Sequence, residues 1–71
     1  MRAKYKKFGN DCVIYVRIIC DENVFIKITS YSGWSELSPE IVTKVYDTNK
    51  EARIMFYNTC DECAKSGYER I

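Results

Sequence analysis

The chain has 71 residues, a formal net charge of +1 and no histidine. A core of this size leaves little room to enclose a substrate. Histidine is the commonest general base and metal ligand, so its absence excludes classical catalytic triads and histidine-bearing zinc sites. We therefore expect one small domain over residues 1–71 that is not an enzyme and holds no cofactor.

Composition and hydropathy favour a cytoplasmic globular protein without membrane contact. Hydrophobic residues make up 46% of the chain and charged residues 30%, as is typical of a folded domain. The longest apolar run, residues 12–20, contains Arg17 and is far shorter than the roughly 18 residues of a membrane span. We expect no signal peptide, because no apolar segment ending in small residues follows the basic residues 1–7. Ile, Lys, Asn and Tyr account for 25 residues, a bias typical of AT-rich genomes such as those of many phages.

Alternating apolar and polar residues predict a hairpin over residues 12–31. Its turn is interpreted as three residues, 21–23, with Asn23 in the left-handed conformation. Residues 1–8 precede the hairpin as a basic arm or a short first strand, and residues 32–40 follow it as a loop.

The last third of the chain predicts a strand and then a helix. Residues 41–46 are β-branched and indicate a strand, and residues 48–66 follow as a helix. Thr48 and Glu51 have the spacing of a capping box, and Gly67 fits the left-handed residue that ends many helices. The helix is expected to turn one arc to the core, formed by Ala52, Met55, Phe56, Thr59, Cys60 and Cys63.

Together these elements predict an α+β fold: an antiparallel meander of three or four strands with one C-terminal helix packed on one face. Such a sheet leaves its other face uncovered. Aromatic and basic residues interleaved on an open sheet are typical of modules that bind single-stranded nucleic acid, and also of dimer interfaces. A second small core under the loop that carries Trp34 is the third interpretation. The residues expected on this face are Val13, Tyr15, Arg17, Ile19, Phe25, Lys27, Thr29 and Tyr31.

Cys60 and Cys63 have the spacing of a zinc knuckle or of a redox pair. A four-thiolate zinc site would also need Cys12 and Cys20, which lie about 26 Å apart at opposite ends of one predicted strand. The pair also lies late in the predicted helix, beside two carboxylates that disfavour a reactive thiolate. We therefore expect reduced, buried thiols and no bound metal.

The C-terminal half resembles the end of a WGR domain. The segment Thr43-Lys-Val-Tyr-Asp-Thr-Asn-Lys-Glu-Ala52, then Phe56 and Gly67-Tyr68, matches that family's strand ending, helix and closing Gly-Tyr. Ser32-Gly33-Trp34 stands where the Trp-Gly-Arg signature is expected, and only its glycine matches. The resemblance implies a sheet with one packed helix and contact with DNA or RNA ends.

Two functions are predicted. The first is a non-catalytic nucleic-acid-binding module, with DNA and RNA both open, in which the basic arm contacts phosphates and aromatic side chains stack on bases. The residues assigned to it are Arg2, Lys4, Lys6, Lys7, Tyr15, Arg17, Phe25, Lys27 and Tyr31. The alternative is a phage-type protein that binds a host enzyme, defence protein or toxin stoichiometrically as an inhibitor or regulator, either as a monomer or as a homodimer. Its expected anchors are Trp34, Ile54 and Tyr57.

Overall fold

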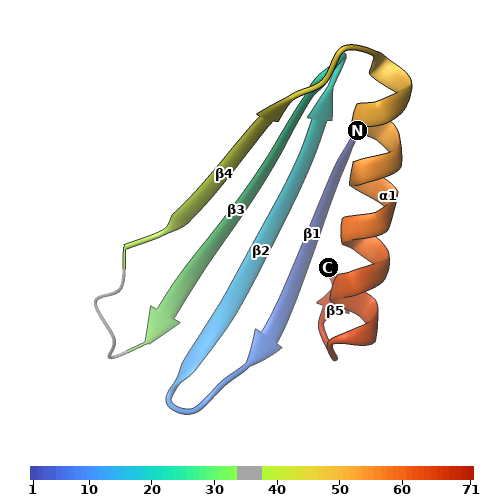
Figure 1. Ribbon diagram of the computed structural model, residues 1–71. Coiled ribbons are helices and arrows are strands. Elements are labelled where there is room, and N and C mark those ends of the chain that lie inside the picture. The colour runs from blue at the N-terminus through green and yellow to red at the C-terminus, as the bar shows by residue number, and fades with distance from the viewer. Residues whose placement is uncertain (34–37) are drawn as a thin grey trace.

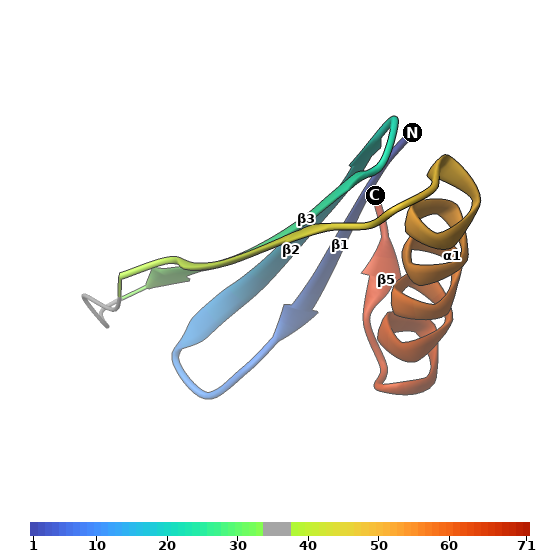
Figure 2. The same ribbon diagram turned by 45° about the horizontal axis from the view of Figure 1, so that its top comes forward.

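The computed structural model describes residues 1–33 and 38–71. Its strands form one antiparallel sheet in the order β4-β3-β2-β1-β5, and α1 lies on one side of that sheet (Figures 1 and 2). This confirms the predicted α+β fold and adds a short strand, β5, that was not predicted. The elements are β1 (Arg2–Phe8), β2 (Cys12–Asp21), β3 (Val24–Gly33), β4 (Glu40–Val45), α1 (Asn49–Lys65) and β5 (Glu69–Arg70).

Both ends of α1 have caps at the predicted residues, and the Thr48 half of the predicted capping box is formed. The Thr48 hydroxyl accepts a hydrogen bond from the backbone N–H of Glu51 at 3.2 Å. At the other end Gly67 has a φ of 84°, and the N–H of Tyr68 donates to the carbonyl oxygen of Cys63 at 3.0 Å. The helix has 17 residues. Within the described part of the chain, no helix is long and apolar enough to cross a bilayer.

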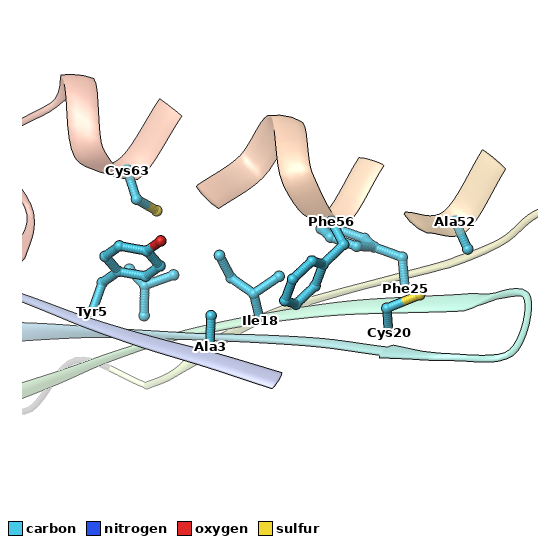
Figure 3. Packing of buried hydrophobic residues seen from close by; sticks show 9 residues of the cluster. Ala3, Tyr5, Ile18, Cys20, Phe25, Ala52, Phe56 and Cys63 are labelled. Atoms are coloured by element: carbon cyan, nitrogen blue, oxygen red, sulfur yellow. The ribbon is translucent and has the colours of Figure 1, made fainter. Parts of the chain in front are cut away.

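The hydrophobic core lies between α1 and the strands β1, β2 and β3 (Figure 3). Ile18 and Phe25 are the largest fully buried side chains, and both point from the sheet toward the helix. The helix contributes the predicted arc, with Met55 and Cys60 partly buried at its margins. The buried residues are Ala3, Tyr5, Val16, Ile18, Cys20, Phe25, Ala52, Phe56, Thr59 and Cys63.

The turn between β2 and β3 has two residues, Glu22 and Asn23, and the predicted three-residue turn is wrong. Glu22, rather than Asn23, has the left-handed conformation, with a φ of 54°. Cys20 therefore pairs with Phe25, whereas a three-residue turn pairs it with Val24. Because side chains alternate between faces, this difference of one residue moves every side chain of β3 to the other face.

The shift corrects the predicted composition of the uncovered face. Phe25, Lys27, Thr29 and Tyr31 lie on the helix side of β3, opposite Cys20, Ile18, Val16 and Ile14 of β2. The aliphatic residues of β3 lie on the uncovered face instead, whereas the predicted three-residue turn would have pointed them toward the helix. Those residues are Val24, Ile26 and Ile28.

Candidate nucleic-acid interface

The sheet face opposite α1, here called the open face, has two chemically different halves. No described segment covers it (Figure 2). β1 and β2 form the basic half, and β3 and β4 form the aliphatic half. The basic half consists of Arg2, Lys4, Lys6, Tyr15 and Arg17. The aliphatic half consists of Val24, Ile26, Ile28, Ile41 and Val45.

Lys4 and Arg17 form the centre of the basic half because they are direct cross-strand partners. The N–H of Cys20 donates to the carbonyl oxygen of Met1 at 2.9 Å, which sets the alternation of hydrogen bonds between β1 and β2. Counting from this bond, Lys4 and Arg17 are a non-hydrogen-bonded pair, the type whose side chains lie closest. Like charges directly opposite one another destabilise a sheet. This arrangement therefore costs folding energy and favours an anionic ligand.

Neither Lys4 nor Arg17 has an ion pair within residues 1–33 and 38–71. The salt bridge there joins Lys65 to Asp61 on α1, at 2.8 Å. Lys6 differs, because its cross-strand neighbour on β5 is Glu69 and its ammonium lies 5.5 Å from the centre of the Phe8 ring. The strongest uncompensated positive charge on the open face is therefore at Lys4 and Arg17.

Two adjacent hollows give the basic half its shape. The larger, of about 340 Å³, is lined in part by Arg2, Lys4, Arg17 and Ile71. The smaller, of about 190 Å³, shares Lys4, Arg17 and Ile71 and adds Tyr15. Ile71 is held beside β1 by its backbone N–H, which donates to the carbonyl oxygen of Lys4 at 2.9 Å. Ile71 was not predicted as a site residue, because β5 has too few residues to show a strand pattern.

Lys7 belongs to the helix side of β1, apart from the other basic residues of this strand. Its ammonium donates to the carbonyl oxygen of Ser66 at 2.9 Å and lies 5.5 Å from the centre of the Tyr68 ring. A cation at the carboxyl end of a helix offsets the partial negative charge there. Lys7 is therefore occupied in holding the end of α1 to the sheet.

Three further residues of the predicted nucleic-acid site lie away from the open face. Phe25 is 1% exposed and belongs to the core. Lys27 and Tyr31 are partly buried on the helix side of β3. The prediction that they share a face with Tyr15 and Arg17 is wrong, because the register of β3 differs by one residue.

The predicted protein anchors lie elsewhere on the molecule. Ile54 and Tyr57 are 50% and 61% exposed on α1. The Tyr57 hydroxyl donates to the sulfur of Met1 at 3.4 Å. Trp34 lies outside the described residues.

All four cysteines are free thiols. Cys20 and Cys63 are buried in the core, as predicted for Cys63, and Cys12 and Cys60 are partly buried. Within the described ranges, no group of three or more His, Cys, Asp or Glu side chains is placed to hold a metal ion. Burial raises the pKa of the Cys63 thiol, which keeps the group neutral at physiological pH.

Three buried or partly buried acidic side chains, the Cys63 thiol and two tyrosine hydroxyls, predict that the fold loses stability at alkaline pH. Burial raises the pKa of the Tyr5 and Tyr68 hydroxyls as well as that of the Cys63 thiol. A raised pKa in the folded state stabilises the fold below the unfolded value and loses that contribution as pH rises. Chemical denaturation from pH 7 to 11 should therefore show a free energy of unfolding that falls above about pH 9. A constant value over that range would contradict the burial of these groups.

Comparison of the chain with protein-family models, curated proteins and solved structures finds no match. The resemblance to WGR domains stays a prediction. The open face is therefore interpreted from its own geometry and charge.

Proposed function

We propose that this protein is a non-catalytic module that binds single-stranded nucleic acid on the basic half of its open face. The observation that carries the proposal is the direct pairing of Lys4 with Arg17 beside an open, partly aromatic surface. Two unpaired cations at the shortest cross-strand separation match the repeating phosphates of a nucleic acid.

Aromatic groups for base stacking lie next to these cations. Tyr15 is 36% exposed and lines the smaller hollow with Lys4 and Arg17. Phe8 is 71% exposed at the end of β1, on the same face as Lys6. Stacking on aromatic side chains tolerates any base, since every base has a flat face. We therefore expect little sequence preference and a preference for single strands over duplexes.

Fluorescence anisotropy with labelled oligo(dT) and oligo(U) of about 20 nucleotides tests the proposal. Four basic residues on the open face predict a slope of the logarithm of the binding constant against that of salt concentration between about −2 and −3, at roughly 0.7 per phosphate contact. A duplex of equal length should bind more weakly. No binding to either oligonucleotide at low salt would remove the proposal's support.

The aliphatic half of the open face favours a second candidate, a small regulator that binds a protein. Ile41 and Val45 are 65% and 67% exposed there. Apolar patches left uncovered on a small domain mark protein contacts. This candidate places the protein partner on the aliphatic half in place of the predicted anchor Ile54. It predicts that Ile26→Glu, in the middle of the aliphatic half, abolishes capture of a specific protein, whereas Ile54→Glu on α1 does not. Equal effects of the two variants would contradict it.

A further inference from the structure

β4 is an open edge of the sheet. It pairs with β3 on one side, and no described strand pairs with its other side (Figure 1). Every residue of β4 is exposed, including Ile41, Val42 and Val45. A row of free backbone donors and acceptors on such an edge is a template for another strand. With six residues, three of them apolar, β4 is a better template than the two-residue β5 at the opposite edge.

The register of β3 and β4 determines which backbone groups of β4 are free. The N–H of Tyr46 donates to the carbonyl oxygen of Asn23 at 2.8 Å, so this pair is of the hydrogen-bonded type. Hydrogen-bonded pairs alternate along an antiparallel ladder. It follows that Glu40, Val42 and Lys44 bond to β3. The N–H and C=O groups of Ile41, Thr43 and Val45 therefore point away from the sheet.

We propose that two copies of this chain pair antiparallel through β4, with Val42 opposite Val42 of the second copy. In this register the outward groups of Ile41 bond to those of Thr43 on the second copy, and the reverse pair follows by symmetry. Antiparallel registers displaced by one residue would set a free backbone group opposite one already bonded to β3, and they are excluded. The proposal goes beyond nucleic-acid binding, since it concerns an edge that lies apart from the basic half.

Charge selects this register among the remaining ones. It places Glu40 directly opposite Lys44 of the second copy, twice by symmetry, in non-hydrogen-bonded pairs where side chains lie closest. A shift of the register by two residues in either direction loses both pairs. A shift by four residues in one direction places Lys44 opposite Lys44 of the second copy. Within the described residues, neither Glu40 nor Lys44 has an ion pair. The Lys44 ammonium lies 5.6 Å from the centre of the Tyr46 ring, on the same side of the sheet as Val42.

The helix does not obstruct this arrangement. In both ribbon views α1 lies toward the β1 side of the sheet, away from the outer side of β4 (Figures 1 and 2). Pairing through β4 gives one continuous ten-stranded sheet, with five strands from each copy and both helices on the same face. The aliphatic halves of the two open faces then adjoin at the centre, and the basic halves lie at the two ends.

Sedimentation velocity on the full chain without nucleic acid tests the pairing. The mass of the wild type should approach twice 8.3 kDa as its concentration rises into the range of about 100 μM. Glu40→Lys and Lys44→Glu should each weaken dimerisation by roughly tenfold or more, because two attractive pairs become repulsive. The double variant E40K/K44E should recover it, as should a mixture of the two single variants. A monomer at every concentration, or a dimer indifferent to both single variants, would overturn the proposal.

A proline variant tests the backbone pairing separately from charge. The N–H of Thr43 points away from β3, so Thr43→Pro keeps every hydrogen bond of β4 to β3. It removes two hydrogen bonds from the proposed dimer and should give a folded monomer. Circular dichroism and the urea midpoint verify the fold. A T43P chain that still dimerises with wild-type affinity would contradict the proposal whether or not nucleic acid binds.

Discussion

Replacing Phe25 with alanine is expected to lower the free energy of unfolding by about 3–5 kcal/mol. The Phe25 ring is 1% exposed and packs between β3 and α1, so its loss leaves a cavity that the small core cannot close (Figure 3). A chain of 71 residues has a total stability of only about 5 kcal/mol. Urea denaturation at 25 °C should therefore find Phe25→Ala with only about 0–2 kcal/mol of stability and a midpoint close to zero urea.

The matched control is Ile28→Ala, which removes an apolar side chain from the other face of the same strand. Ile28 is only partly buried on the open face, and its loss should cost about 1 kcal/mol. The comparison measures which residues of β3 face the helix. If Ile28→Ala costs more than Phe25→Ala, the three-residue turn is correct and the described register is wrong.

Reversing both charges at the centre of the basic half should remove nucleic-acid binding. The variant Lys4→Glu/Arg17→Glu replaces two facing cations with two facing carboxylates. A hydrogen bond to a charged group contributes roughly 1.5–3 kcal/mol, and each 1.4 kcal/mol is about tenfold in affinity. We expect the affinity for oligo(U) in the anisotropy assay to fall at least about 100-fold.

The control for this variant makes the same change of net charge on the other side of the molecule. Lys50→Glu/Arg53→Glu alters two exposed residues of α1 and should leave most of the affinity intact. The single variant Lys4→Glu sharpens the test, because it converts a repulsive pair into an attractive one. It should raise stability by about 0.2–1 kcal/mol while it weakens binding. Equal losses of affinity in the two double variants would mean that net charge alone governs binding.

The helix was predictable because its signals are local. Thr48 and Glu51 lie three residues apart and make their hydrogen bond within the first turn. Gly67 ends the helix because its positive φ is available without strain. The period of 3.6 residues then placed Phe56 and Cys63 in the core, as the structure confirms. None of these features depends on a distant part of the chain.

The faces of the sheet were less predictable, because they depend on the parity of one turn. Asp21 and Asn23 are both turn-forming residues, and the sequence pattern does not determine whether Asp21 ends β2 or begins the turn. Both faces of β3 carry apolar residues, so hydrophobic alternation could not decide either. The buried aromatic ring of Phe25 fills more of the core than Ile26 would, which favours the observed register.

The candidate site shows the same division between local and distant information. Arg2, Lys4 and Lys6 alternate along the sequence, so their common face follows once β1 is a strand. Their meeting with Arg17 depends on the pairing of β1 with β2, and the hollow beside them depends on Ile71 from the end of the chain. Tertiary pairing of this kind has no signature in a single sequence.

The most direct test of the open face as the binding surface is a methyl NMR titration with oligo(U), using chains labelled at isoleucine. Ile19 and Ile71 line the larger hollow of the basic half, whereas Ile54 is exposed on α1. The open-face account predicts shifts or broadening of the Ile19 and Ile71 methyl signals at low salt, with Ile54 unchanged. Shifts confined to Ile54, or no shift at any of the three residues, would contradict it.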